Sequence, residues 1–150
     1  LPILADGDDM DDPVVDSARS ILDGHIVLSR KIAQKNHFPA IDVLQSASRV
    51  MRSVISPEHV SWAGQLREWM ATYAQAEDLI NIGAYVRGTN SKIDQAIVVN
   101  EKINAFLRQG IDEKCNYSQT EALMHSIVRS GEAFLQSTQQ AGQQPGAVRR

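Results

Sequence analysis

The sequence of 150 residues has a single cysteine, Cys115, and no long apolar run. A single cysteine excludes an internal disulfide, and no histidine or second cysteine stands near Cys115 at the spacing of a zinc site. No apolar run reaches the roughly 18 residues that a membrane-spanning helix needs, and the N-terminus lacks the segments of a secretory signal. A reducing, cytoplasmic compartment is therefore expected.

The chain also lacks an excess of positive charge. Its formal net charge is -3, so its composition gives no general attraction to nucleic acid or to an anionic membrane surface. With 43% apolar residues the chain can bury a core, which favours one folded domain, or a fragment of a larger one, over general disorder. It opens on the apolar LPIL without an initiator methionine, and we expect it to begin partway through a larger protein.

Familiar catalytic motifs are missing. The sequence contains no G-x-x-x-x-G-K-[ST], G-x-G-x-x-G, H-E-x-x-H or G-x-S-x-G. The four histidines fall in different segments, and each is predicted to be a surface or packing residue (His25, His37, His59 and His125). Composition and periodicity alone thus indicate a folded domain without an assigned chemistry.

Short elements of mixed type are predicted for the first third of the chain. Leu1 to Ala5 suits a buried strand, and Asp12-Pro13 reads as an N-cap followed by a proline that begins a helix. Ile26 to Leu28 suits a second buried strand, and Ser29 can cap a helical turn through Lys35. This alternation is typical of the edge of an α/β sheet. The predicted apolar face of the first helix consists of Val14, Ala18, Ile21 and Leu22.

Two further segments show no helical or strand periodicity. Residues 36–54 are predicted to form an ordered loop, which is where binding sites are often found. Asp6 to Asp12 holds five aspartates, which repel one another and therefore lie in solvent, bind a cation or meet a basic partner. The ligand spacing and closing glutamate of an EF-hand are absent from this acidic loop.

Three amphipathic helices are predicted for the rest of the chain. Ser56-Pro57-Glu58 begins the first, which ends near Gly83 and carries two tryptophans expected to anchor the core. Ser91, with Asp94 three residues on, begins the second, and the capping box Ser118-x-x-Glu121 begins the third. Three consecutive helices with short links form a small bundle. The Gln- and Gly-rich residues 138–150 are predicted to be a disordered tail.

The segment DGHIVLSRKIAQKNHFPAIDVLQSASRVM, preceded by GDDMDDPVVDSARSIL, resembles the C-terminal part of the flagellar and type III secretion export ATPases. These are relatives of the catalytic subunit of rotary ATP synthases. The resemblance implies a mainly α fold with a small α/β portion, namely the edge of a RecA-like nucleotide-binding domain followed by a C-terminal helical bundle. It assigns residues 1–55 to the end of the ATPase domain, 56–137 to the helical domain and 138–150 to the tail.

Arg49 stands where this family carries its arginine finger, after Ser46, Ala47 and Ser48. The resemblance implies that its guanidinium reaches the terminal phosphate bound by a neighbouring subunit. A guanidinium suits this task because it stays charged and its donors can pair with phosphate oxygens as charge develops. Such fingers are typically worth about 10³ to 10⁵ in rate. A structural arginine paired with Asp42 or Glu58 is the other interpretation.

Phe38, followed by Pro39, falls where the family places an aromatic ring against adenine. Phenylalanine keeps the stacking face of the tyrosine that is common in the synthase relatives. The proline restricts the residue before it to extended conformations, which serves adenine contact and core packing equally. A core phenylalanine beneath the loop is the alternative. A second aromatic of the synthase adenine pocket has no clear counterpart at Gly110-Ile111.

The acidic loop corresponds to the loop with which the rotary relatives grip their central stalk. The resemblance implies that Asp8, Asp9, Asp11 and Asp12 line the pore of a ring and face a basic coiled-coil stalk protein. Binding a basic partner would relieve the mutual repulsion of these carboxylates. A purely solvated loop remains the other interpretation.

One departure separates the branches of the family. ATP synthase catalytic subunits carry an acidic DELSEED segment after the first long helix, whereas this chain reads AYVRGTNSK from Ala84 to Lys92. The absence of acids favours the secretion and flagellar branch over an ATP synthase subunit. A non-enzymatic helical adaptor derived from such an ATPase is a third possibility, and a G-x-x-x-x-G-K-[ST] upstream would argue against it.

The resemblance therefore implies the C-terminal fragment of a homo-hexameric ATPase that hydrolyses ATP to energise or prepare protein secretion. Implied partners are the coiled-coil stalk, export substrates with their chaperones, and an export gate that holds the ATPase at the bacterial inner membrane; no nucleic acid is expected. Implied cofactors are ATP and Mg²⁺, whose ligands lie upstream of this segment. We expect the segment to be inactive alone.

Overall fold

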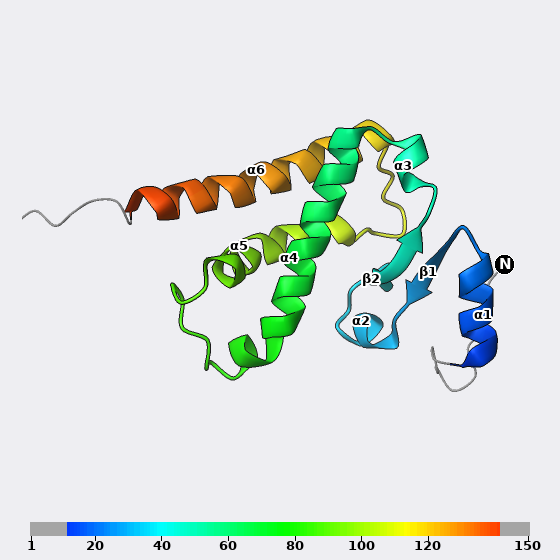
Figure 1. Cartoon of the computed structure of the whole chain (residues 1–150), viewed down its shortest axis with the longest axis horizontal. Helices are drawn as coiled ribbons and strands as arrows, with labels where there is room; N and C mark the ends of the chain where they lie inside the picture. The colour runs from blue at the N-terminus through cyan, green and yellow to red at the C-terminus, as the bar shows by residue number, and fades with distance from the viewer. Residues whose placement is uncertain (1–11, 142–150) are drawn as a thin grey trace, which may run out of the picture.

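The computed structural model describes residues 12–141. In chain order it contains α1 (Pro13–Ile21), β1 (Gly24–Leu28), α2 (Arg30–Gln34), β2 (Ile41–Ser48), α3 (Met51–Val54), α4 (Pro57–Asn81), α5 (Ser91–Leu107) and α6 (Tyr117–Ala141). The short elements of residues 12–55 form a sheet module beside the three long helices, the helical bundle (Figure 1). The predicted strand Leu1 to Ala5 lies outside the described residues. Within residues 12–141, no helix is long and apolar enough to cross a membrane.

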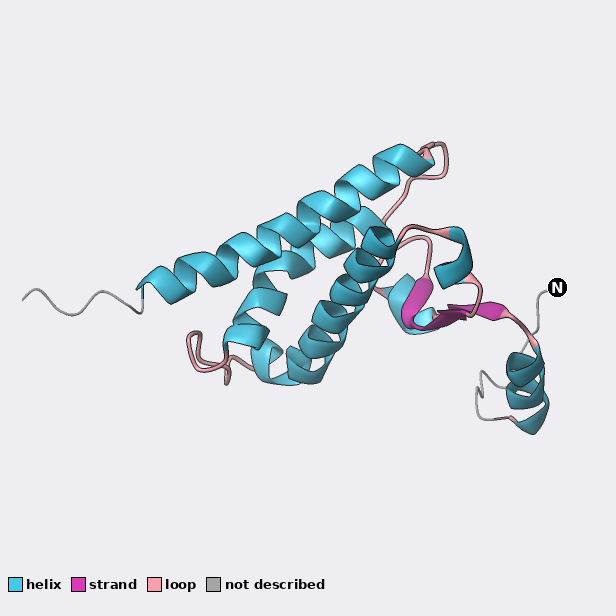
Figure 2. Ribbon diagram, turned by 45° about the horizontal axis from the view of Figure 1, so that its top comes forward, coloured by secondary structure: helices cyan, strands magenta, loops and turns pink. Residues whose placement is uncertain are grey.

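Helix α1 begins where the sequence predicts. One carboxylate oxygen of Asp12 accepts hydrogen bonds from the backbone N–H groups of Val14 and Val15, at 2.8 and 3.2 Å. The predicted apolar face is wrong, because Val14 and Ile21 are 74% and 81% exposed while Val15 is buried. That face has no packing partner among the described residues, since α1 lies on the far side of the strands from the bundle (Figures 1 and 2).

Strand β1 forms at the predicted position but is not buried as predicted. Val27 is buried, whereas Ile26 and Leu28 are 72% and 73% exposed. The reason is that β1 pairs with β2 in a two-stranded antiparallel sheet. A single pair of strands leaves most of both faces uncovered.

Residues 36–54 contain regular structure, which corrects the prediction of a loop. They hold the eight-residue strand β2 and the short helix α3. The pairing shifts register within β2: Val27 pairs with Asp42, but His25 pairs with Ala47. This irregularity interrupts the alternation of inward and outward side chains, so β2 carries no period-two pattern that the sequence could reveal.

The first two long helices have side-chain N-caps. The hydroxyl of Ser56 accepts a hydrogen bond from the N–H of His59 at 3.1 Å and begins α4, as predicted. Helix α5 is capped by Asn90 instead of Ser91, because the Asn90 side chain accepts from the N–H groups of Lys92 and Ile93. The α4 helix ends before Gly83, whose φ of 69° suits a glycine at this position.

Helix α6 begins with a capping box two residues earlier than predicted. The Asn116 side chain accepts from the N–H of Gln119 at 2.9 Å, and the Gln119 side chain accepts from the N–H of Asn116 at 3.0 Å. Glu121 does not close a box with Ser118; its carboxylate lies 3.2 Å from Nδ1 of His59 in α4. At its other end α6 extends to Ala141, into the range 138–150 predicted as a tail, and residues 142–150 lie outside the described part.

The core lies within the helical bundle, where the three long helices pack along one another (Figure 2). Trp69 is 4% exposed and Val99 is fully buried, and Gly131 of α6 packs directly against the Trp69 ring. The prediction that tryptophan anchors the core is correct for Trp69, while Trp62 packs at the edge of the core and stacks on His125. The buried cluster consists of Leu66, Trp69, Ala96, Val99, Ile103, Met124, Ile127 and Val128.

Candidate functional site

Phe38, Pro39 and Arg49 lie in the sheet module, and three polar contacts hold this module against the bundle. The guanidinium of Arg67 in α4 binds carbonyl groups of β2. Lys35 forms an ion pair with Glu77 at 2.9 Å. The backbone N–H of Gln109, just after α5, donates to the carbonyl oxygen of Phe38 at 2.9 Å. These contacts with the bundle therefore fix the position of the module that carries the site.

Phe38 lies in the turn between α2 and β2, with its side chain partly in solvent. The residue is 53% exposed, so its ring is not the core side chain that the sequence left open as an alternative. The Phe38-Pro39 peptide bond is cis. An exposed aromatic ring on a turn anchored at both sides can present its face to a flat apolar partner.

The surroundings of Phe38 include two residues that the sequence did not single out, Arg108 and Gln109. Partial burial lowers the pKa of the neighbouring His37 from its usual 6.5, and the positive charge of Arg108 lowers this pKa further. A hydrogen bond to the Leu107 backbone acts in the opposite direction and raises it. The segment after α5 is thus next to the Phe38 turn, which is where the synthase pattern would place its second aromatic.

Arg49 directly follows β2 and is exposed. Its backbone N–H donates to the carbonyl of Asp23 at 2.7 Å, and its guanidinium donates to the carbonyl of Ser20 at 3.1 Å. Within residues 12–141, Arg49 forms no salt bridge with Asp42 or Glu58, the partners considered from the sequence. A solvent-facing guanidinium held by one carbonyl oxygen is available for a stronger acceptor.

The structure does not bring Phe38 and Arg49 together. Phe38 precedes β2 and Arg49 follows it, so the two side chains lie at opposite ends of this strand. An aromatic face and a guanidinium in this arrangement suit two separate ligands better than one compact ligand.

The predicted partner-binding loop is described only at its last residue. Asp8, Asp9 and Asp11 lie outside the described residues. Asp12 has a local structural role, because its carboxylate caps α1. The cap uses one carboxylate oxygen of Asp12, so this local role stands beside the predicted one.

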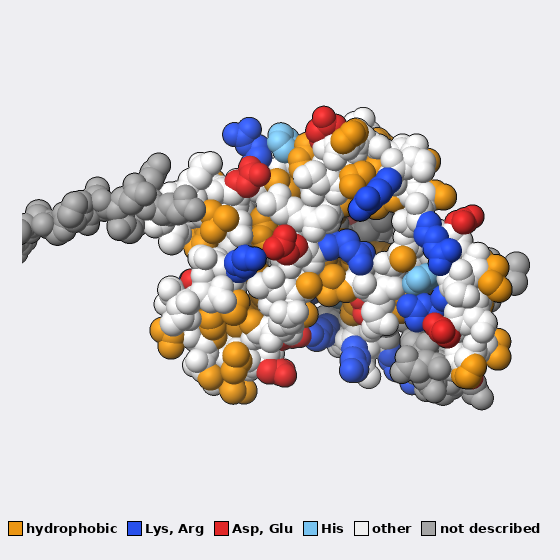
Figure 3. Space-filling view, viewed as in Figure 1, with side chains coloured by type: hydrophobic (Ala, Val, Ile, Leu, Met, Phe, Trp, Pro, Cys, Tyr) orange, Lys and Arg blue, Asp and Glu red, His pale blue; other side chains and the backbone are white. Residues whose placement is uncertain are grey.

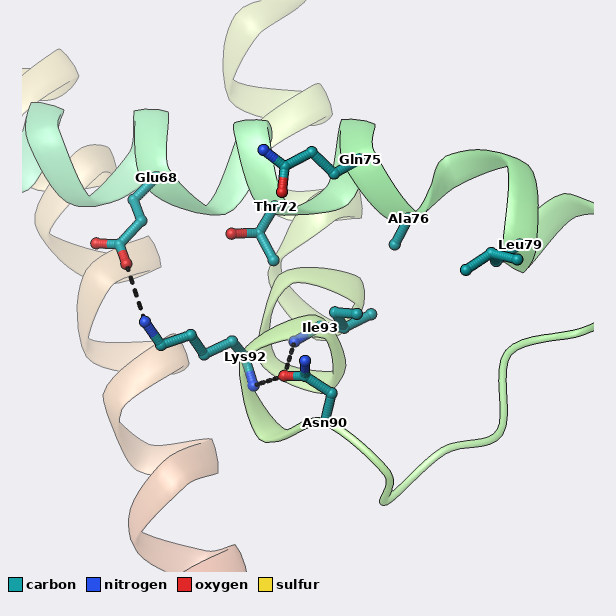
Figure 4. A pocket seen from close by; sticks show the side chains of 8 residues that line it. All are labelled: Glu68, Thr72, Gln75, Ala76, Leu79, Asn90, Lys92 and Ile93. Carbon is teal, nitrogen blue, oxygen red and sulfur yellow. Dashed lines mark hydrogen bonds and ion pairs between the residues drawn. The ribbon is translucent and has the colours of Figure 1, made fainter.

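A hollow between α4 and the beginning of α5 contains none of the predicted site residues (Figure 4). Lys92 reaches across it to Glu68, with a distance of 3.9 Å between Nζ and Oε1. Its lining residues are Glu68, Thr72, Gln75, Ala76, Leu79, Asn90, Lys92 and Ile93. Among the described residues, no group of three or more His, Cys, Asp and Glu side chains could hold a metal ion.

Large apolar side chains are exposed at the tip of the bundle, where α4 ends and the chain turns toward α5. Leu79 is 49%, Ile82 75% and Val86 65% exposed. Apolar side chains gather over this end of the molecule at the lower left of the space-filling view (Figure 3). We call these three residues the tip patch.

Two protein-family models match the chain. One, described as the T3SS EscN ATPase C-terminal domain, matches residues 55–126. The other, described as the ATP synthase alpha/beta family, nucleotide-binding domain, matches residues 1–48.

Relatives and solved structures agree with these matches. The flagellum-specific ATP synthase of Bacillus subtilis is 46% identical over 130 residues, which cover 87% of this chain and 30% of the relative. The assembled ATPase EscN of the enteropathogenic E. coli type III secretion system superimposes with a TM-score of 0.80 at 42% identity, covering 84% of this chain and 31% of that one. The same ATPase in complex with its central stalk EscO gives a TM-score of 0.73 at 43% identity, covering 77% and 29%. The chain thus spans about 30% of the length of these relatives.

The antiparallel strand pair and the turn with Phe38 therefore belong to the part of the chain that matches the nucleotide-binding domain of the ATP synthase alpha/beta family, and most of the three-helix bundle belongs to the part that matches the T3SS EscN ATPase C-terminal domain. The predicted fold, a RecA-like edge followed by a helical bundle, is confirmed. Within that family, the chain belongs to the flagellar and type III secretion ATPases and is their C-terminal part. The branch indicated by Ala84 to Lys92 is thereby also confirmed.

Proposed function

We propose that the full-length protein is a ring-forming ATPase coupled to protein export, in which this chain supplies an arginine finger in trans and an adenine contact. The observation that carries the proposal is the exposed guanidinium of Arg49, which directly follows β2 in the family's S-x-S-R sequence. Family membership with flagellar and secretion ATPases supports the reaction class.

Arg49 would act by exchanging one hydrogen-bond acceptor for another. In the free chain its guanidinium donates to the Ser20 carbonyl, a neutral acceptor. A terminal phosphate of a neighbouring subunit offers charged oxygens, with which a guanidinium can form two parallel hydrogen bonds in which both partners are charged. The guanidinium would therefore leave Ser20 for the phosphate and stabilise the charge that develops during hydrolysis.

Phe38 would serve the nucleotide of its own subunit. Its ring is half-exposed on a turn held by Gln109, so it can stack against adenine without refolding of the module. Because Phe38 and Arg49 lie at opposite ends of β2, the two residues would serve two nucleotides in adjacent interfaces.

The assembly and its partners follow the same proposal. The protein would form a homo-hexamer with a coiled-coil stalk protein in its pore, gripped by the loop with Asp8, Asp9, Asp11 and Asp12. The solved complex of EscN with its central stalk supports such a partner. The tip patch would contact export substrates and chaperones at the export gate, on the cytoplasmic side of the bacterial inner membrane, without nucleic acid.

ATP and Mg²⁺ are the cofactors of the proposed reaction. Mg²⁺ would neutralise phosphate charge when bound, and residues 12–141 contain no cluster of acids and histidines to hold it. The phosphate-binding loop and the metal ligands would come from the part of the protein upstream of this chain. The chain's own residues then bind adenine and reach the phosphate of the neighbour, and the isolated chain should not hydrolyse ATP.

The test is ATP turnover by the full-length protein with Arg49→Ala. We expect nucleotide binding and assembly to persist while turnover falls by about 10³ to 10⁵. A trans role predicts complementation: subunits with Arg49→Ala, mixed with subunits whose phosphate-binding lysine is replaced, regain turnover because intact sites and intact fingers meet at some interfaces. Unchanged turnover by the Arg49→Ala protein, or a mixture that stays inactive, contradicts the assignment.

A further inference from the structure

The strand that precedes Arg49 is interrupted. Residues 43–46 of β2 stand opposite Ile26 alone, because the pairing with β1 shifts register there. Such a bulge bends a strand and redirects the residues that follow it. Its unpaired backbone groups also need partners from elsewhere. The direction in which the chain reaches Arg49 therefore depends on what holds the bulge.

Side chains of the sheet module form hydrogen bonds with some of the backbone groups at the bulge. One carboxylate oxygen of Asp42 accepts from the backbone N–H groups of Leu44 and Gln45, each at 3.1 Å. The hydroxyl of Ser46 donates to the Asp42 carbonyl at 2.6 Å. Nε2 of His25 lies 3.0 Å from the Gln45 carbonyl oxygen, to which it donates. The carbonyl groups of Val43, Leu44 and Ser46 are bound from outside the sheet module.

Arg67 of α4 binds all three. Its Nη1 donates to the carbonyl oxygens of Val43 and Ser46, at 2.6 and 3.2 Å, and its Nη2 donates to that of Leu44 at 3.1 Å. A planar guanidinium with donors in a fixed fork can span several acceptors at once, which a lysine ammonium cannot do in the same geometry. The bulge is therefore shaped by a side chain from the helical bundle.

We propose that Arg67 is a positioning residue for Arg49, acting through the bulge of β2. The proposal rests on the proposed role of Arg49 as the finger. Without Arg67, water would bind the three carbonyls, and the end of β2 would no longer have a single direction. A displacement of about 1 Å at a reacting group can cost about 10²-fold in rate, so a remote hydrogen-bonding residue can have a large effect.

The test compares Arg67→Ala with Arg49→Ala, and with both changes together, in ATP turnover by the full-length protein. We expect Arg67→Ala to lower kcat by about 10- to 10²-fold and to leave the KM for ATP within about twofold, because nucleotide contact by Phe38 is untouched. In the Arg49→Ala background, Arg67→Ala should cause no further loss, since there is no finger left to position. Arg129→Ala is the matched control, an exposed arginine of α6.

The outcomes separate this proposal from the proposed function. If Arg49→Ala lowers turnover but Arg67→Ala does not, or if Arg67→Ala lowers it equally in both backgrounds, Arg67 does not act through the finger. If Arg49→Ala leaves turnover unchanged, the finger itself is wrong and the positioning role falls with it.

A second measurement covers the case in which Arg67→Ala fails to assemble. Hydrogen exchange of the amides of Ala47, Ser48 and Arg49 can be followed in the full-length protein with the milder Arg67→Gln. We expect faster exchange at these positions than in the Arg129→Ala control, with exchange in α5 unchanged. Equal exchange at the end of β2 in both variants would overturn the proposal.

Discussion

The backbone N–H of Gln109 donates to the carbonyl oxygen of Phe38 at 2.9 Å, across a separation of 71 positions in the chain (109 minus 38). The contact joins the end of α5 to the turn that carries the predicted adenine contact. It does not use either side chain, so substitutions of the Phe38 ring leave it in place. The ring can therefore be varied without disturbing the turn.

Phe38→Ala in the full-length protein should raise the KM for ATP more than it lowers kcat. Stacking on adenine is the same in the ground state and the transition state, and its loss weakens binding without changing the chemical step. Steady-state ATP turnover measures both constants. Phe38→Tyr is the control that keeps the stacking face, and its KM should stay close to that of the unchanged protein.

An unchanged KM in the Phe38→Ala protein would remove Phe38 from the nucleotide site. A fall in kcat with constant KM would instead indicate a role in positioning the neighbouring strand.

His37 should make the fold less stable at low pH. Because its pKa in the folded chain lies below 6.5, the unfolded chain binds more protons as the pH falls. The contribution of neutral His37 to stability is thus present above about pH 6.5 and is lost as the pH falls through its lowered pKa. Urea unfolding of the chain at about pH 8 and about pH 5 measures the change.

We expect the loss of unfolding free energy between these two pH values to be smaller with His37→Gln, which removes the titrating group. Arg108→Ala should also reduce it, because the charge of Arg108 contributes to the lowered pKa. An identical pH dependence in all three proteins would contradict this cause.

Gly131→Ala should destabilise the bundle. A Cβ at Gly131 would lie 2.5 Å from Cη2 and 2.6 Å from Cζ2 of Trp69, and this ring is held in the core. Overpacking of this kind typically costs about 1–3 kcal/mol. Denaturant unfolding of the chain measures the cost.

The matched control is Gly64→Ala within α4, where a Cβ meets nothing within 4 Å. Here alanine should stabilise by about 0.5–1 kcal/mol, because glycine is a poor residue for a helix interior. Equal effects of the two substitutions would show that Trp69 does not limit the space at Gly131.

Asn116→Ala should destabilise α6, whereas Ser118→Ala should have little effect. Asn116 forms the capping box with Gln119, and loss of an N-cap side chain costs about 0.5–2 kcal/mol. Thermal or urea unfolding of the chain ranks the two variants. A larger loss from Ser118→Ala would restore the helix start that the sequence alone predicts.

The sequence predicts helices better than strands in this chain, for a physical reason. Helix starts depend on local capping chemistry, so Asp12 and Ser56 could be assigned directly, and the predicted start of α6 differs by only two residues because two capping boxes compete in its sequence. Strand β2 depends on pairing with β1 and on a bulge that hides its alternation. Such long-range pairing leaves no local pattern to read.

The residues of the candidate site also differ in whether local sequence reveals them. Phe38 and Arg49 could be proposed as site residues because they stand in sequence motifs that resemble those of a family. Arg67 could not, because an arginine on the polar side of an amphipathic helix looks like any solvated residue. Only the fold brings its guanidinium to the carbonyl groups of β2.

The clamp between Arg67 and β2 limits how pieces of related ATPases can be exchanged. A chimaera that joins the first 55 residues of one relative to the helices of another would preserve each hydrophobic core. It would still leave β2, and the proposed finger Arg49 that follows it, without these contacts unless the incoming helix carried an arginine at the same register. The segment to exchange as one piece therefore extends from β1 to the middle of α4. It crosses the boundary between the segments that the two family models match, residues 1–48 and 55–126.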